Sequence, residues 1–233
     1  MTLIAASIIA TNEAEFIEPL LERLAFCDYV CIADFGSTDG TLGLIEKYGG
    51  PGWQLVKANE WPDNFAVARQ VAYEAIPPEV DWWFRFDADE TPSLAFIRDV
   101  RDALGSLPPE IEAVRIRQTN YVGDEKHYAA NLGGFETHPR IFRHIITPER
   151  WHTWTGNVHE FVQVMSRDGL KPIPQDQIAT WNVPVFHRGW LSQKRREERE
   201  DQYAQMPGSG VTGRGDLTDR HYDIRLVPVE VDN

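Results

Sequence analysis

Three carboxylates directly follow an aromatic-rich run in the first half of the chain. Trp82–Phe86 carries four aromatic residues and one arginine, and Asp87, Asp89 and Glu90 come at its end. The run is typical of a buried strand, and ligands of open α/β sheets bind at the carboxyl ends of strands. Acids this close repel one another unless a cation or hydrogen-bond donors neutralise them, and Mg²⁺ and Mn²⁺ prefer oxygen ligands. Asp87 and Asp89 share a face only if the chain stays extended between them.

A second interpretation of this stretch needs no ligand. The acids can form a turn before a helix, with Thr91 or Ser93 as the N-cap of that helix. The stretch alone supports both interpretations equally, so the surrounding elements must decide between them.

Strands and helices alternate over the first half of the sequence. Such alternation indicates a parallel sheet with right-handed crossovers, so we expect an α/β fold with a Rossmann-like mixed, mainly parallel sheet flanked by helices. Apolar runs predict strands at Leu3–Ala10, Tyr29–Ala33, Trp53–Lys57, Trp82–Phe86 and Ala113–Tyr121. Helical spacing and capping residues predict helices at Glu13–Leu24, from about Thr41, at Asn64–Ala75 and at Ser93–Leu104.

The second half contains only short strand-like pieces, such as Arg140–Phe142 and Val158–Met165, among Gly, His, Trp and Pro. We expect them to form a small antiparallel extension of the same sheet. Residues 1–205 would then be a single domain with halves at 1–120 and 121–205. The Gly-rich residues 206–233 are expected to be a mobile tail or a lid.

Composition narrows the class of protein. The chain has 233 residues, is 42% hydrophobic and carries a net charge of −13, which disfavours broad binding to nucleic acid without excluding it. No apolar run is long enough for a transmembrane segment, and Met1–Ile4 lacks the basic start of a signal peptide. We interpret Cys27 and Cys31 as reduced, mostly buried thiols and expect a cytoplasmic protein.

Three polar loops follow predicted strands, at Thr11–Glu13, Asp34–Thr41 and Asp87–Glu90. Their acids can bond ribose hydroxyls or a base edge, and a metal ion can bridge a diphosphate to a carboxylate. The glycine patterns of dinucleotide-binding and P-loop proteins are absent from the sequence. Taken alone, Asp34–Thr41 is better interpreted as a helix-capping turn, with Ser37 or Asp39 as the cap.

The order of these loops resembles glycosyltransferase family 2, which has the GT-A fold. The segments that carry the resemblance are Asn12–Glu13, Asp34–Thr41, Asn64–Arg69 and Phe86–Glu90. In the second half, His138–Arg143, Gly156–Glu160 and Val185–His187 resemble the branch related to lipopolysaccharide-core glucosyltransferases. The resemblance covers about residue 3 to residue 190.

The resemblance implies an inverting transfer of a hexose from a nucleotide diphosphate sugar, with uridine diphosphate (UDP) as the expected carrier and Mn²⁺ or Mg²⁺ as the cofactor. It implies a catalytic base at Glu160 and metal ligands at Asp89 and His187. The donor-binding positions that it implies are Thr11, Asn12, Glu13, Asp34, Asp39, Arg69, Asp87 and Ala88. The acceptor hydroxyl stays open: a glycan, a lipid, a protein, a small molecule or a modified nucleobase.

Two positions depart from the family pattern. Phe35 stands where an acid or a serine is common, and Gln70 replaces the usual asparagine after Arg69. Two of the implied roles also have structural alternatives. Glu160 can instead form a salt bridge with Arg140 or Arg143, and His187 can be a core-edge histidine bonded to a carbonyl.

Two other functions remain open at this point. A nucleotidyltransferase on a similar sheet would need a Gly-rich loop with Arg or Lys after the first strand, and the acidic Thr11–Glu13 counts against it. A non-catalytic module that binds a nucleotide or a sugar would keep the fold without the chemistry, since fold does not fix function.

Overall fold

The computed structural model describes residues 1–122, 124–129, 139–157, 160–189, 191, 197, 201, 204 and 226–228. Most of the expected tail or lid at 206–233 lies outside these residues, as do His138, Val158 and His159. No helix in the described part of the chain is both long and apolar enough to cross a membrane.

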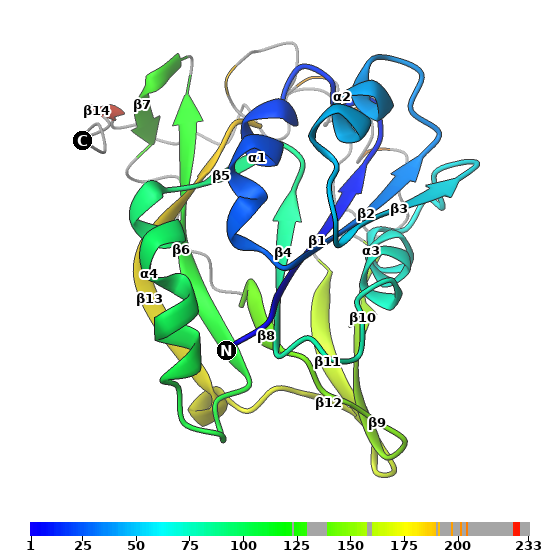
Figure 1. Ribbon diagram of the computed structural model, residues 1–233, viewed down its shortest axis with the longest axis vertical. Helices are drawn as coiled ribbons and strands as arrows, with labels where there is room; N and C mark the ends of the chain where they lie inside the picture. The colour runs from blue at the N-terminus through cyan, green and yellow to red at the C-terminus, as the bar shows by residue number, and fades with distance from the viewer. Residues whose placement is uncertain are drawn as a thin grey trace.

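A mixed sheet forms the centre of the molecule (Figure 1). Its described strands are β1 (Ile4–Ala10), β2 (Tyr29–Phe35), β3 (Trp53–Ala58), β4 (Trp82–Asp87), β5 (Glu90–Pro92), β6 (Ala113–Val122), β7 (Asp124–Ala129), β8 (Ile141–Arg143), β13 (Ile178–His187) and β14 (Leu226–Pro228). The strand order is β14-β7-β6-β8-β4-β1-β2-β3, and β13 pairs with β5 and β6. Strands β4, β1, β2 and β3 are parallel neighbours, which confirms the parallel sheet expected for the first half.

The helices are α1 (Glu18–Arg23), α2 (Thr41–Tyr48), α3 (Phe65–Glu74) and α4 (Leu94–Gly105), with short 3₁₀ turns at Leu24–Phe26 and Gln175–Gln177. The structure decides between two candidates for each of two N-caps. Asn64, and not Asp63, caps α3, and its side chain accepts from the Val67 amide at 3.1 Å; Ser93, and not Thr91, caps α4, and its side chain accepts from the Phe96 amide at 3.1 Å. Helix α1 begins five residues after the expected Glu13, with Pro19 in its first turn, where a missing N–H costs nothing.

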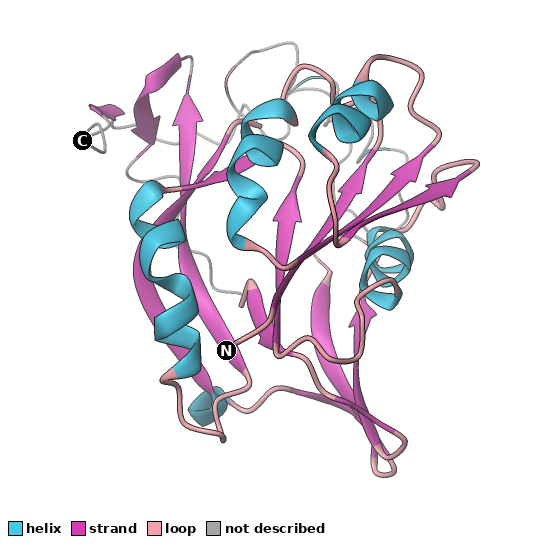
Figure 2. Ribbon diagram, viewed as in Figure 1, coloured by secondary structure: helices cyan, strands magenta, loops and turns pink. Residues whose placement is uncertain are grey.

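Side-chain alternation along β4 divides the core between the two faces of the sheet. Trp82, Phe84 and Phe86 belong to the apolar cluster that contains residues of α1, α2 and α4. The residues that alternate with them, Trp83, Arg85 and Asp87, therefore point to the opposite face. Figure 2 shows α1, α2 and α4 in front of the sheet, with α3 on the other side. Arg85 and Asp87 are thus directed toward α3 and the segments packed beside it.

A second, antiparallel sheet covers that opposite face. Its described strands are β9 (Ile146–Thr147), β10 (Arg150–Thr155), β11 (Phe161–Ser166) and β12 (Gly169–Pro172). We expected the antiparallel pieces to extend the main sheet, and this is wrong for these four strands. Their buried side chains include Trp154, Val162 and Val164 and the imidazole of His152. The Trp154 ring packs against Trp83 of β4, with 5.9 Å between the ring centroids. The strands therefore lie over the face of the main sheet, and the chain returns to that sheet through β13.

The two cysteines are free thiols. Cys31 is buried in β2, where burial raises the pKa of its thiol to about 12. Burial also raises the pKa of Cys27 well above its ordinary value, and the neighbouring carboxylate of Asp28 adds to this. Both thiols stay protonated at neutral pH.

Candidate functional site

The three polar loops meet at one edge of the main sheet. Ala10 of β1 lies opposite Asp34 of β2, and Ile9 of β1 lies opposite Asp87 of β4. Because the three strands are parallel, the loops that follow them leave the sheet on the same side. The convergence expected from the sequence is confirmed.

Hydrogen bonds join the first two loops. The Asn12 side-chain oxygen accepts from the Thr38 amide at 2.8 Å, and the Glu13 amide donates to Oγ1 of Thr41 at 2.8 Å. Both oxygens of Asp39 are engaged, by the Ala14 amide at 3.0 Å and the Thr41 amide at 2.9 Å. Burial raises the pKa of Asp39, but these bonds outweigh it and hold the pKa below its ordinary value. Gly40, rather than Ser37 or Asp39, is the N-cap of α2.

Asp34 shapes the second loop from inside. Its side chain is 1% exposed, and it accepts from the amide of Ser37 at 3.1 Å and from the hydroxyl of Ser37 at 2.5 Å. Gly36 follows with φ of +78°, and a Cβ there would lie 2.9 Å from the carbonyl oxygen of Asn59. Glycine is therefore required at this position. Phe35, one of the two residues that depart from the family pattern, packs edge-on against Trp61, with 5.5 Å between ring centroids.

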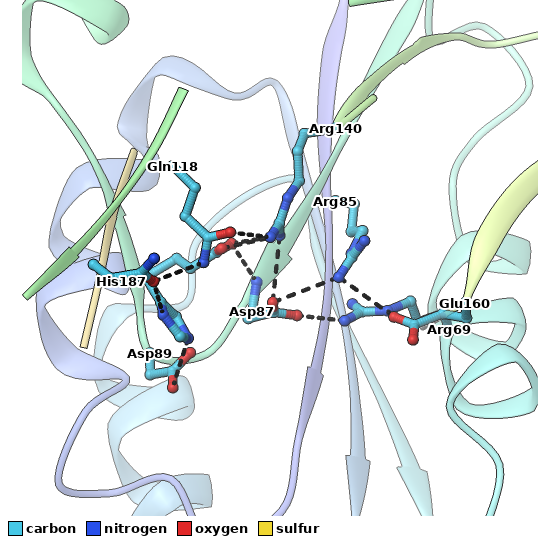
Figure 3. Close-up of polar contacts among 10 residues, drawn as sticks. Arg69, Arg85, Asp87, Asp89, Gln118, Arg140, Glu160 and His187 are labelled. Atoms are coloured by element: carbon cyan, nitrogen blue, oxygen red, sulfur yellow. Dashed lines mark hydrogen bonds and ion pairs between the residues drawn. The ribbon is translucent and has the colours of Figure 1, made fainter. Parts of the chain in front are cut away.

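The third loop separates its two aspartates. Strand β4 ends at Asp87, and Ala88 and Asp89 form a turn before β5. The chain is not extended there, so the condition for a shared face is not met. Asp87 points toward a group of arginines and Asp89 toward His187 (Figure 3). Each aspartate therefore has its own electrostatic environment.

Asp87 accepts hydrogen bonds from Arg69 and Arg140 and forms an ion pair with Arg85. Arg69 of α3 bonds its Oδ1, and Nη1 of Arg140 lies 3.3 Å and Nη2 of Arg85 3.6 Å from its Oδ2. Burial raises the pKa of Asp87, but the three guanidinium groups outweigh it and hold the pKa well below its ordinary value. Asp87 is therefore an ionised carboxylate at neutral pH.

Glu160 lies at the other end of the arginine group and is 7% exposed. Its Oε1 accepts from Nε of Arg69, and Nη2 of Arg85 lies 3.4 Å from the same oxygen. The salt-bridge partners that we expected for Glu160 are wrong. Arg140 pairs with Glu90 at 2.9 Å, and the Arg143 guanidinium lies 4.5 Å from the centre of the Trp82 ring.

Helix α3 fixes the segment that leads to Glu160. The Asn64 side chain donates to Oδ1 of Asn157 at 2.6 Å, and the Phe65 amide donates to the Asn157 carbonyl at 3.0 Å. Farther along α3, the Gln70 side-chain oxygen accepts from the Trp154 amide at 3.2 Å. Gln70, which departs from the family pattern, thus connects the helix to the small sheet.

His187 and Asp89 form a buried pair, 6% and 1% exposed. Nε2 of His187 lies 3.4 Å from Oδ2 of Asp89, and Nδ1 lies 2.7 Å from Oδ1 of Asn120. Because an amide oxygen only accepts, Nδ1 is the donor in this contact, and Nε2 is the ring nitrogen that faces Asp89. The carbonyl expected in the alternative interpretation of His187 is thus present, as a side-chain amide.

A carboxylate beside an imidazole nitrogen is a donor set that suits Mn²⁺ or Mg²⁺. Within the described residues, no three His, Cys, Asp or Glu side chains gather closely enough to hold a metal ion by themselves. Asp89 and His187 therefore suit an ion that takes its other oxygens from a substrate diphosphate and water.

One chain of polar contacts connects the two ends of the site (Figure 3). Arg140 donates to the Gln118 side-chain oxygen at 3.0 Å, and the Gln118 amide donates to Asn120 at 3.4 Å. The full order is Glu160, Arg69, Asp87, Arg140, Gln118, Asn120, His187 and Asp89.

The sequence interpretation missed Arg85, Gln118 and Asn120 as members of this site. Arg85 had a usable signal, because it shares a strand face with Asp87 two residues later. The two β6 residues had none, since their partners Arg140 and His187 become neighbours only in the folded chain.

The sequence model of the family described as Glycosyl transferase family 2 matches residues 6–170 of this chain. A curated relative, the lipopolysaccharide core biosynthesis glycosyltransferase LpsC of Rhizobium meliloti (strain 1021), is 32% identical over 119 residues. The match covers 51% of this chain and 43% of the relative, so it spans less than half of the relative's length.

Two solved structures share the fold. That of S. aureus TarS 1-349 in complex with UDP has a TM-score of 0.54 at 14% identity, covering 88% of this chain and 67% of that chain. Glucosyl-3-phosphoglycerate synthase from Mycobacterium tuberculosis, in complex with Mn²⁺, UDP and glucosyl-3-phosphoglycerate, has a TM-score of 0.50 at 17% identity, covering 90% and 82%. The expected fold class is therefore confirmed.

Proposed function

The chain belongs to glycosyl transferase family 2, and we propose that it transfers a hexose from a UDP-linked donor to an acceptor hydroxyl with inversion. One observation carries the proposal. A buried carboxylate, Glu160, and a buried pair of metal-binding type, Asp89 and His187, lie at the same sheet edge and are joined by a single chain of polar contacts.

The donor would lie across the three converging loops. Thr11, Asn12 and Glu13 would contact the base or the ribose, and Asp39 would face the uracil from the rim of the second loop. Asp34 would support that loop from below. Arg69, Asp87 and Ala88 would line the side of the donor nearest the sheet. The UDP held by the TarS structure, and the UDP and Mn²⁺ held by the M. tuberculosis structure, motivate the choice of carrier and ion.

Asp89 and His187 would hold Mn²⁺ or Mg²⁺. When bound, such an ion stabilises the negative charge that develops on a departing diphosphate. Two contacts would orient these ligands. Asn120 accepts from Nδ1 of His187, and the Arg188 amide donates to the Asp89 carbonyl at 2.9 Å. The positions of both ligands are thus set by neighbouring groups.

Glu160 would take the proton of the acceptor hydroxyl. Although burial raises its pKa, Arg69 and Arg85 outweigh that effect and hold the pKa below its ordinary value. Glu160 is therefore ionised and able to accept a proton at neutral pH. A single base that assists direct attack on the anomeric carbon gives inversion, because no covalent sugar intermediate forms.

Two measurements test the proposal. Calorimetry against a panel of nucleotide diphosphates and nucleotide sugars, with and without Mn²⁺, should find metal-dependent binding of a uridine nucleotide. Glu160→Gln should bind the same nucleotide with unchanged affinity but release UDP from its sugar at least about 100-fold more slowly.

The matched control is Glu149→Gln, which neutralises a more exposed glutamate paired with Arg167 in the small sheet. It should leave both binding and turnover unchanged. No binding to any nucleotide would overturn the donor assignment, and full turnover in Glu160→Gln would overturn the catalytic base.

A further inference from the structure

Arg85 is a charged residue in the interior of the site to which the proposed reaction assigns no contact with donor, metal or acceptor. It is carried by β4, two residues before Asp87 and on the same strand face. Its side chain is 13% exposed, and its Nη2 lies 3.4 Å from Oε1 of Glu160 and 3.6 Å from Oδ2 of Asp87. Arg85 therefore stands between two of the acids of the site (Figure 3).

An indole ring restrains the two guanidinium groups that reach Glu160. The Arg85 guanidinium lies 5.8 Å and the Arg69 guanidinium 5.5 Å from the centre of the Trp154 ring. Contacts of this kind favour a cation over the ring face. Trp154 is itself fixed, because its amide donates to Gln70 of α3. The Trp154 ring thus restrains Arg69 and Arg85 while they contact the carboxylate of Glu160.

Both arginines address the same oxygen of Glu160. Nε of Arg69 donates to Oε1, Nη2 of Arg85 lies 3.4 Å from the same oxygen, and no described residue donates a hydrogen bond to Oε2. A hydrogen bond from Arg69 and an ion pair with Arg85 on the same oxygen restrict rotation of the carboxylate. The second oxygen keeps its lone pairs for a proton.

We propose that Arg85 is a positioning residue for Glu160: with Arg69 it holds Oε1 in place and thereby presents Oε2 to the attacking hydroxyl. This inference rests on the proposed function, since it concerns the base of that reaction. It adds a residue to which no donor, metal or acceptor contact is assigned.

The charges around Glu160 support the assignment. The groups that face it are Arg69 from α3 and both Arg85 and Asp87 from β4. Burial and Asp87 raise the pKa of Glu160, whereas the two arginines lower it. Removing Arg85 takes away one of these two positive charges and leaves Asp87 in place, so the carboxyl of Glu160 should become easier to protonate.

The first experiment measures this carboxyl directly. Protein labelled with ¹³C-glutamate is titrated by NMR, and the Glu160 signal is identified by its absence in Glu160→Gln. In Arg85→Met the titration midpoint should rise by about one pH unit. Arg85→Lys should restore part of the shift because it keeps the charge. Arg98→Met, which removes an exposed arginine paired with Asp99, should leave the midpoint unchanged.

The second experiment measures release of UDP from UDP-glucose with water as the attacking hydroxyl. Arg85→Met should lower kcat about tenfold or more at unchanged KM, and should move the acidic limb of the kcat/KM profile upward by the same shift as the NMR midpoint. Thermal unfolding of each variant shows whether the fold is intact. If Arg85→Met does not fold, Arg85→Lys and Arg85→Gln carry the test.

The outcomes separate this inference from the proposed function. An NMR midpoint and a kcat that are both unchanged in a folded Arg85 variant overturn the role of Arg85 and leave Glu160 as the base. Full UDP release by Glu160→Gln overturns the base itself, whatever the Arg85 variants do.

Discussion

Nε2 of His187 lies 3.4 Å from Oδ2 of Asp89, although the two residues are brought together by strands far apart in the sequence. His187 ends β13, and Asp89 lies in the turn after β4. Strand β13 pairs with both β5 and β6, which places His187 opposite Glu90 on one side and Asn120 on the other. The pair is therefore a product of the sheet topology.

Asp89→Asn should remove metal-dependent binding of UDP while leaving the fold intact. The amide keeps the size of the carboxylate but loses its charge, and a divalent ion needs that charge. Calorimetry with UDP and Mn²⁺ should show a larger loss of affinity than the roughly 10- to 100-fold that removal of a supporting group costs. Asp99→Asn, on the exposed surface of α4, is the control and should bind normally. Unchanged affinity in Asp89→Asn would exclude Asp89 as a ligand.

Asn120→Ala should weaken metal binding without removing a ligand. Its Oδ1 is 2.7 Å from Nδ1 of His187, and loss of this contact frees the ring to rotate and to change tautomer. Removing such a supporting group costs about 10- to 100-fold in affinity. Titration of Mn²⁺ by electron paramagnetic resonance measures the effect. Asn182→Ala, at an exposed position of the same strand as His187, should have no effect, and equal affinities in the two variants would refute the role of Asn120.

His152 should make the fold sensitive to acid. It is 1% exposed in β10, and burial, with Arg150 and His144 nearby, lowers the pKa of its imidazole to about 3. The unfolded chain binds this proton near pH 6.5. The contribution of the neutral His152 imidazole to the free energy of unfolding is therefore complete above about pH 6.5. It is lost as the pH falls toward 3, by up to about 1.4 kcal/mol per pH unit.

Urea unfolding between pH 7 and pH 4 tests this sign. His152→Phe keeps an aromatic ring among Trp83 and Phe142 and removes the titrating group. The stability of the variant should fall less steeply with acid than that of the parent chain. Parallel curves for the two proteins would show that His152 does not control the acid response.

Gly36→Ala should destabilise the second polar loop, Asp34–Thr41. The residue has φ of +78°, and an added Cβ would lie 2.9 Å from a backbone oxygen, so we expect a loss of about 1–3 kcal/mol. Gly43→Ala is a matched control within α2, where nothing lies within 4 Å of the added carbon. It should stabilise the chain by about 0.5–1 kcal/mol, because alanine is the better helix former. Chemical denaturation of the two variants should therefore shift in opposite directions.

The sequence by itself determined the features that depend on neighbouring residues. The strand at Trp82–Phe86, the helix starts near Asn64 and Ser93, and the convergence of three loops follow from side-chain alternation, local hydrogen bonds and the rule that parallel strands end at one edge. The candidate residues Asp89 and His187 were also found from the sequence, through the family resemblance. Their contact was not.

Only the tertiary structure decided how those residues are paired. The partners of Glu160 are Arg69, 91 positions away, and Arg85, and not Arg140 or Arg143. The turn at Ala88 and Asp89 separates two aspartates that the motif places side by side, and β9–β12 cover a face of the main sheet where an extension of its edge was expected. These outcomes depend on packing between distant segments. The sequence shows that a residue is an arginine, but the fold decides which carboxylate that arginine contacts.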